Sequence, residues 1–418
     1  MRLPRRVFTA VAAGIVLALA GATAAQADQV RGMEYWLSDY GVSRAWATTR
    51  GAGVTIAVID TGIDSSVPEL AGAVIGGTDV SGIGAGNGQK PLGGTESGHG
   101  TWVASLLAGR GTGGGNGVIG VAPAASILSI SVALGEENAP VSSDDQIANG
   151  VRWAVDHGAS VINMSLTRNT LDWPVSWDSA FQYAADHNVV IVAAAGNRGS
   201  GTSEVGAPAT IPGVLTVAGV DRSGKASFDA SSQGITIAVA APSEQLVGAD
   251  PGGGYVQWSG TSGAAPLVAG IVALVRAAHP GLDAANVINR VVKTARAVGA
   301  VPSPIYGNGL VDAAAAVTAE VAPVTANPMG DLKEWVRIHR RAEPATGATS
   351  VPIIPPAATT PKALPPDRSV NMAEFLAPQW DVATSFGVPF ALFVGFGALV
   401  GLGIAGARLH FRRASRRG

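Results

Sequence analysis

Four polar residues of this chain have the types that acyl transfer requires, and each lies just after a buried strand or at the start of a helix. Asp60 follows the apolar run "VTIAVI", and Asn197 follows "VVIVAAAG". His99 lies in the turn "SGHGTWVAS", and Ser262 begins the helix-like run "SGAAPLVAGIVALV". A serine hydroxyl needs a base, a group that orients the base, and donors for the oxyanion. Ser262, His99, Asp60 and Asn197 match these roles in order, and the Ser262 backbone N–H adds a second oxyanion donor.

Each of these residues also has an ordinary structural interpretation. Asp60 could be a turn residue, Asn197 stands in a Gly-Asn turn, and Ser262 could be a helix N-cap. His99 is harder to explain in this way, because a glycine on each side lets the backbone approach a ligand. The five other histidines lie at expected helix ends or outside the expected sheet: His157, His187, His279, His339 and His410.

The elements that must position these residues are short apolar runs that alternate with helix-like segments from Val54 onward. The runs are "VTIAVI", "SILSISV", "SVINMS", "VVIVAAA", "VLTVAGV" and "ITIAVA". Strands that are apolar on both faces suit a buried parallel sheet with helices on each side. We therefore predict an α/β three-layer sandwich with a mostly parallel central sheet. In such sheets, ligands bind at the carboxyl ends of the strands, where Asp60 and Asn197 are expected.

Composition excludes several other classes of function. The chain has no cysteine, so disulfides and thiolate metal sites are absent, and its formal net charge is −2. Basic residues cluster only in residues 333–341 and at the C-terminus, so nucleic-acid binding is not expected. "GRGTGG", residues 109–114, has dinucleotide-loop spacing, but a helix-like run precedes it instead of a strand, so no cofactor is predicted. The oxygen-rich loop at residues 76–88 leaves structural calcium an open question.

The two ends predict targeting segments. Residues 1–27 have the basic, apolar and small-residue regions of a signal peptide. Residues 382–407 contain no charge and are long enough for one transmembrane helix, and the arginine-rich tail, residues 408–418, predicts a cytoplasmic C-terminus. Seven of the 23 residues from Pro344 to Pro366 are proline, so residues 323–381 are expected to form an extended linker. The catalytic body is therefore predicted to lie outside the cytoplasm, attached to membrane lipid.

With these motifs in view, the chain resembles the subtilisin-like serine proteases. The resemblance rests on "VIDTGID" around Asp60, "GHGTWVAS" around His99, "VINMSL" and "AAAGN" in the middle, and "GTSGAAP" around Ser262. These motifs have the family's Asp, His, Ser order. The resemblance implies an endopeptidase that acts on polypeptides through an acyl-enzyme. It places the catalytic domain at residues 45–322, after an N-terminal extension at residues 28–44.

The resemblance also implies where an extended substrate lies. The groove would be bordered by two segments, Ser165, Leu166 and Thr167 in the first and Ala194, Ala195 and Gly196 in the second. Many relatives have glycine after the equivalent of "VINMSL", whereas this chain has Thr167, which predicts a narrower substrate choice. Gly263 stands where relatives often have methionine, and it predicts a less constrained backbone beside the nucleophile.

The proline-rich linker, single C-terminal span and basic tail further resemble the mycosins, membrane-anchored subtilisin-like proteases of type VII secretion systems. The absence of cysteine departs from that group. This resemblance implies processing of secreted proteins and contact with a secretion complex. Two alternatives stay open, a general quality-control protease of the cell surface and a protease-like scaffold of a secretion complex.

Overall fold

The computed structural model describes four stretches of the chain, residues 30–93, 97–133, 138–201 and 203–340. Contacts divide the chain into two units, Met1–Glu343 and Pro344–Gly418, and all described residues belong to the first. The predicted signal peptide, transmembrane helix and basic tail therefore lie outside the described residues.

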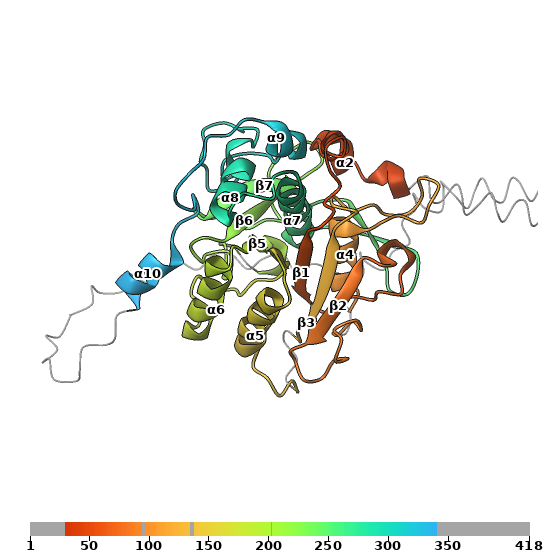
Figure 1. The fold of residues 1–418 in the computed structure, drawn as a ribbon, viewed down its shortest axis with the longest axis horizontal. Helices are drawn as coiled ribbons and strands as arrows, with labels where there is room; N and C mark the ends of the chain where they lie inside the picture. The colour runs from red at the N-terminus through yellow and green to blue at the C-terminus, as the bar shows by residue number, and fades with distance from the viewer. Residues whose placement is uncertain (1–29, 94–96, 134–137, 202, 341–418) are drawn as a thin grey trace, which may run out of the picture. The chain divides into compact units, whose positions relative to one another are not determined.

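A seven-stranded parallel sheet forms the centre of the described unit (Figure 1). Its strand order is β2-β3-β1-β4-β5-β6-β7, so β1 lies between β3 and β4 although it comes first in the chain. Every residue of β4, β5, β6 and β7 is buried, as expected from their predominantly apolar runs. The strands are β1 Thr55–Asp60, β2 Val74–Asp79, β3 Ser126–Ser131, β4 Val161–Met164, β5 Val190–Ala194, β6 Leu215–Val220 and β7 Ile237–Pro242.

Helices cover both faces of this sheet. Successive side chains of a strand point to opposite faces. A Cβ added at Gly150, in α5 (Ser143–Asp156), would lie 3.5 Å from Ile59, whereas one added at Gly100, in α4 (His99–Ala108), would lie 3.3 Å from the Asp60 carboxylate. Hence α5 and α4 lie on opposite faces. Because α6 (Val175–Asp186) packs on α5 and α7 (Thr261–Ala278) packs on α4, the predicted three-layer α/β sandwich is confirmed.

Local sequence sets where several helices begin. Side chains of Ser142, Asp283, Asp312 and Asp331 accept hydrogen bonds from backbone N–H groups in the first turns of four helices. The remaining helical segments lie at the two ends of the described unit and in two short loops. They are α2 Trp36–Asp39, α3 Val42–Ala45, η1 Pro68–Leu70, η2 Arg198–Ser200, α8 Ala284–Lys293, α9 Ala313–Thr318 and α10 Leu332–His339.

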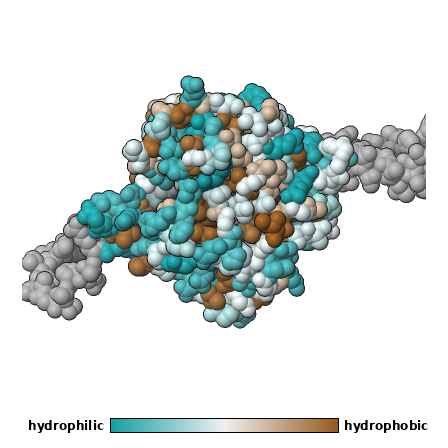
Figure 2. Space-filling model, viewed as in Figure 1, coloured by the Kyte–Doolittle hydropathy of each residue, from teal (hydrophilic) through white to brown (hydrophobic). Residues whose placement is uncertain are grey.

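Helix α7 is the centre of the hydrophobic core. Within the described residues it is the one helix long and apolar enough to cross a membrane, but 78% of its apolar window is buried inside the protein. It packs against β1 and β4 through β7, which explains its apolar composition. On the face of the molecule drawn in Figure 2, apolar residues are interspersed with polar ones.

Two parts of the structure differ from the sequence-based expectations. Strand β2 falls in a glycine-rich stretch that was expected to be a loop, and Gly77 lies so close to the backbone oxygens of Ser129 and Asn87 that a Cβ would clash. The linker was expected to begin at residue 323, but residues 323–340 pack on the catalytic unit. Arg340 pairs with Asp178 at 3.0 Å, and Trp335 contacts Trp173 with ring centroids 4.4 Å apart.

Candidate active site

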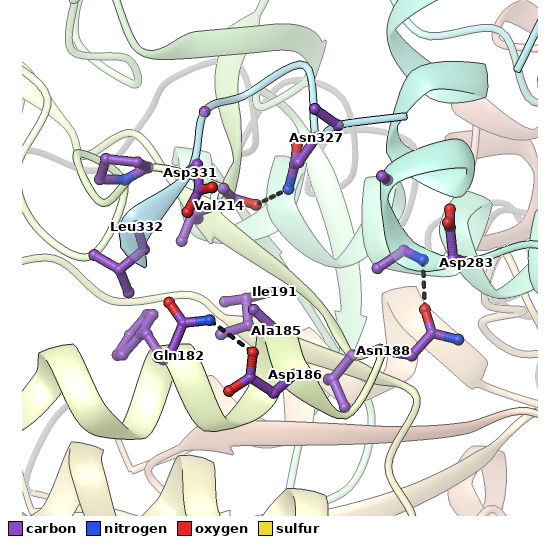
Figure 3. A pocket seen from close by; sticks show the side chains of 18 of the residues that line it. Gln182, Ala185, Asp186, Asn188, Ile191, Val214, Asp283, Asn327, Asp331 and Leu332 are labelled. Carbon is purple, nitrogen blue, oxygen red and sulfur yellow. Dashed lines mark hydrogen bonds between the residues drawn. The ribbon is translucent and has the colours of Figure 1, made fainter. Parts of the chain in front are cut away.

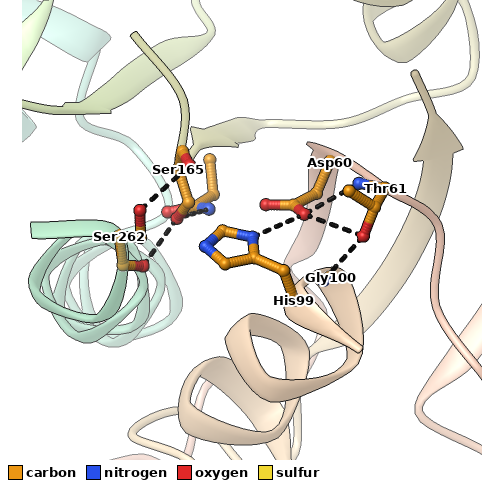
Figure 4. Close-up of polar contacts among 7 residues, drawn as sticks. Asp60, Thr61, His99, Gly100, Ser165 and Ser262 are labelled. Atoms are coloured by element: carbon orange, nitrogen blue, oxygen red, sulfur yellow. Dashed lines mark hydrogen bonds and ion pairs between the residues drawn. The ribbon is translucent and has the colours of Figure 1, made fainter. Parts of the chain in front are cut away.

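Asp60 ends strand β1 at the carboxyl edge of the sheet and is 4% exposed. Its Oδ1 accepts hydrogen bonds from the Thr61 backbone N–H at 2.7 Å and from His99 Nδ1 at 2.8 Å (Figure 4). The Thr61 hydroxyl also donates to Oδ1 at 3.3 Å and accepts the Gly100 N–H at 3.1 Å. Thr61 thus ties Asp60 to the first turn of α4, where His99 is the first residue.

His99 is held between the carboxylate and two aromatic side chains. The indole rings of Trp102 and Trp258 lie 6.2 Å and 5.6 Å from the imidazole, centroid to centroid. Trp102 Nε1 donates to Asp250 Oδ1 at 2.9 Å, which attaches α4 to the antiparallel hairpin β8 (Leu246–Ala249) and β9 (Tyr255–Trp258). No local sequence pattern marks either tryptophan as part of the site, although Trp102 lies one helical turn after His99.

Ser262 is the second residue of α7, and its hydroxyl donates to the backbone carbonyl of Ser165 at 3.2 Å. In return the Ser165 hydroxyl donates to the Ser262 carbonyl at 2.8 Å and accepts the Asn163 side-chain amide at 3.0 Å. Ser165 directly follows β4, which is the strand beside β1. Figure 4 shows the imidazole of His99 between Asp60 and the Ser262 and Ser165 pair.

Asn197 lies just beyond β5 and is oriented by the residue before Ser262. Its Oδ1 accepts the Thr261 backbone N–H at 2.8 Å and the Thr261 hydroxyl at 2.9 Å. This leaves the Nδ2 donor available next to Gly260, where an added Cβ would lie only 3.0 Å from Nδ2. Gly260 has a φ of 147°, a conformation that side chains rarely adopt. The Asn197 amide and the Ser262 N–H can therefore face one oxygen atom, whereas the Thr261 and Gly263 N–H groups already have partners.

The structure corrects the interpretation of Gly263. A Cβ at this position would clash with Leu246 Cδ1 and would lie 3.3 Å from the Trp258 ring. The Leu246 and Trp258 side chains thus occupy the space beside Ser262 that a larger residue at position 263 would need, so the Gly263 backbone is packed against the hairpin.

The residues expected to border the groove follow two adjacent strands, β4 and β5. Leu166 and Thr167 are half-buried. The side chains of Ala194 and Ala195 are buried in the core, so only their backbone could meet a substrate. The Gly196 N–H donates to the Thr261 hydroxyl at 3.1 Å, which joins this segment to the start of α7.

The loop considered for calcium presents no open carboxylate at Asp79. Its two oxygens accept the hydroxyls of Ser81 and Ser131, both at 2.7 Å, and the N–H groups of Gly82 and Gly84. Burial raises the pKa of Asp79, but these hydrogen bonds outweigh it and hold the pKa below its usual range. Within the described residues, no group of three or more His, Asp or Glu side chains is placed to hold a metal ion.

A cavity of about 400 Å³, lined by none of the candidate catalytic residues, lies between α6, the start of α8 and the segment that leads into α10 (Figure 3). Gln182 and Asp186 of α6, Asp283 and Asp331 line it. Because Asp283 and Asp331 cap helices and Asp186 accepts the Gln182 amide, these side chains already have structural partners.

The carboxylate and imidazole pair, the serine at a helix start and the amide beside it are the groups found in one class of protein, the hydrolases that use an activated serine. The family follows from comparison. Residues 51–309 match the model of the subtilase family of peptidases, and the chain belongs to that family. It is a subtilisin-like serine protease.

Three relatives illustrate the match. Subtilisin E of Bacillus subtilis is 37% identical over 286 residues, which cover 66% of this chain and 70% of subtilisin E. The crystal structure of MycP1 from Mycobacterium smegmatis is 30% identical, with a TM-score of 0.59, and the match covers 71% of this chain and 86% of MycP1. The MycP3 protease from the type VII (ESX-3) secretion system is 34% identical, with a TM-score of 0.57, over 67% of this chain and 86% of MycP3.

Proposed function

We propose that this protein is an endopeptidase that cleaves polypeptides through an acyl-enzyme on Ser262, with His99 as the base and Asp60 as its orienting group. The observation that carries the proposal is the 2.8 Å contact between His99 Nδ1 and the buried Asp60 carboxylate, with the imidazole turned toward the start of α7. This contact fixes the proton on Nδ1 and leaves Nε2 as an acceptor.

The proposed reaction uses these groups in turn. His99 Nε2 takes the Ser262 proton as Oγ forms a bond to the peptide carbonyl carbon. The Asn197 amide and the Ser262 N–H stabilise the oxyanion. The C–N bond breaks, and the amine leaves with the proton from His99. Water then attacks the acyl-enzyme with His99 again as base, which releases the acid and restores Ser262.

A fluorophosphonate probe tests this assignment, because it phosphonylates activated serines. We expect the full-length protein to be labelled at Ser262 and the Ser262→Ala variant to be unlabelled. Ser259→Ala is the matched control, because Ser259 is exposed and lies three residues earlier, where its Oγ accepts the Gln245 N–H. Labelling that persists in Ser262→Ala would overturn the proposal.

We further propose that the protein is held in the cell membrane by residues 382–407, with its catalytic domain outside the cytoplasm, and processes secreted proteins in the manner of a mycosin. The support is the sequence pattern at both ends together with the likeness to MycP1 and MycP3. Membrane lipid and a type VII secretion complex are then its partners.

Two measurements in the source cells test this role. External protease should digest the catalytic domain in intact cells, and the protein should sediment with membranes. The secreted proteome of a Ser262→Ala strain should contain at least one unprocessed protein. If deletion of the gene stops secretion but Ser262→Ala leaves all secreted proteins processed, the protein serves as a scaffold and the processing role is wrong.

A further inference from the structure

We infer that the residue preceding the cleaved bond must be small, either glycine or alanine. The inference rests on the proposed function, since it concerns the substrate of the same site. It is carried by close contacts between the chain that follows β4 and the loop around Gly206.

The first step locates the side chain of that residue. The Ser262 hydroxyl contacts the Ser165 carbonyl at 3.2 Å, and Asn197 is bonded to Thr261. A carbonyl carbon within reach of Ser262 therefore lies between the chain after β4 and the chain after β5. The substrate residue that contains this carbonyl carbon must therefore place its side chain in the space between these two segments.

The second step concerns the inner end of this space, where the chain after β4 contacts the loop around Gly206. The Arg168 N–H donates to the Ala207 carbonyl at 2.7 Å, and the Ala207 N–H donates to the Thr170 carbonyl at 2.9 Å. These bonds hold the chain after β4 in contact with Gly206, which is buried. A Cβ at Gly206 would clash with the Arg168 carbonyl oxygen and would lie 2.5 Å from Thr167 Oγ1.

Thr167 is the residue that fills the gap. Its hydroxyl donates to the Arg168 carbonyl at 2.9 Å, so the side chain is fixed against Gly206 and does not swing away. A substrate side chain larger than a methyl group would have to displace Thr167 or break the backbone bonds beneath it. Overpacking of this kind is costly in well-packed sites.

Charge does not offer another basis for selection here. The Arg168 guanidinium forms an ion pair with Asp144 and lies 5.6 Å from the centre of the Trp177 ring. It is therefore engaged on the side of α5 and α6. Size therefore remains the property by which the surface formed by Thr167 and Gly206 discriminates among substrates.

The test uses the full-length protein in detergent and a series of peptides that differ only in the residue before the cleaved bond. We expect kcat/KM for glycine and alanine to exceed that for leucine, phenylalanine, glutamate and lysine by at least about 10-fold, the scale on which pockets discriminate by size. Preference of the native protein for leucine or phenylalanine would overturn the inference.

A variant that removes the Thr167 side chain should enlarge this space. Thr167→Gly should raise kcat/KM for leucine relative to alanine by about 10-fold or more, while Thr325→Gly should leave the ratio unchanged. Thr325 is the matched control because it undergoes the same change, is exposed and lies in the segment that leads into α10, outside the contacts around Gly206. An unchanged ratio in Thr167→Gly would also overturn the inference.

Fluorophosphonate labelling of Ser262 separates the two possible failures. A protein that is not labelled and cleaves no peptide contradicts the proposed function. A protein that is labelled and cleaves, but prefers large residues, contradicts only the size selection.

Discussion

Two carboxylates, Asp60 in the candidate active site and Glu34 in the N-terminal extension, are buried to a similar extent in different regions of the molecule. Asp60 is 4% exposed and Glu34 is 3% exposed. Each has a basic side chain nearby, His99 at 2.8 Å and Arg31 at 3.4 Å, and each has one buried oxygen without a hydrogen-bond partner among the described residues. Burial beside a basic side chain is therefore common to both regions and does not by itself mark a catalytic group.

The difference lies in what surrounds each carboxylate. Asp60 ends a parallel strand and accepts hydrogen bonds from the Thr61 backbone, the Thr61 hydroxyl and the His99 imidazole. Glu34 lies in the N-terminal extension and, from the residues that the structure describes, accepts one hydrogen bond, from the Ile119 N–H. Burial raises the pKa of Glu34 to about 8, which outweighs the effect of Arg31. A carboxylate that serves chemistry needs several donors and a partner that can exchange a proton, whereas Glu34 has neither.

The strongest test of this contrast is Asp60→Asn. We expect kcat to fall by about 10⁴-fold, because the amide does not hold His99 in the tautomer that accepts the Ser262 proton. Peptide hydrolysis measured under saturating substrate checks the prediction. Glu34→Gln is the matched control, since it makes the same chemical change in a buried carboxylate, and it should retain native kcat. A loss of less than 10-fold in Asp60→Asn would remove the functional difference between the two carboxylates.

A second test concerns the charge that develops in the catalytic region. Asn197→Ala should lower kcat by about 10² to 10³-fold with little change in KM, because the amide donates only to the developing oxyanion. Asn197 Oδ1 also positions Thr261, so Thr261→Val measures that separate contribution. A larger loss in Thr261→Val than in Asn197→Ala would mean that Asn197 acts mainly by positioning the start of α7.

The sequence predicts most of the central sheet and the principal residues of this region because both depend on local patterns. Predominantly apolar runs indicate β1 and β3 through β7, and polar residues beside glycine indicate His99 and Ser262. Strand β2 escapes prediction because it is partly exposed at the sheet edge and contains two glycines, of which Gly77 is needed for close approach to β3.

Long-range contacts account for what the sequence does not predict in the site. The paired hydrogen bonds between Ser165 and Ser262 join residues 97 positions apart. Leu246 and Trp258 fill the space beside Gly263, and only the folded hairpin brings them there. The packing of residues 323–340 likewise depends on contacts such as that of Arg340 with Asp178, which no local pattern encodes.

A third test uses the pH dependence of stability. Glu34 ionises near pH 4.5 in the unfolded chain and near pH 8 in the folded protein, so the folded state binds an extra proton between these values. Stability should therefore fall as pH rises through this window, by on the order of a few kcal/mol. Glu34→Gln should flatten this slope and unfold at a higher temperature than the native protein at pH 8.

The measurement is the unfolding temperature at pH 5, 6, 7 and 8. Glu320→Gln serves as the control because Glu320 is exposed. Parallel curves for the native protein and Glu34→Gln would show that Glu34 is already ionised in the folded state, and the contrast with Asp60 would then be lost.

The smallest expected effect comes from Arg31, the cation beside Glu34. Its side chain also donates to the carbonyls of Gly115 and Asn116, both at 3.0 Å. Arg31→Met should cost about 1 kcal/mol through these bonds. It should also raise the pKa of Glu34 further, because the nearby positive charge is lost. Stability should then continue to fall above pH 8, where the native curve levels off.

Denaturant unfolding at pH 7 and pH 9 measures this further loss of stability. The extra loss at pH 9 should vanish when Arg31→Met is combined with Glu34→Gln. An extra loss that survives in the double variant would place its source outside the Arg31 and Glu34 pair.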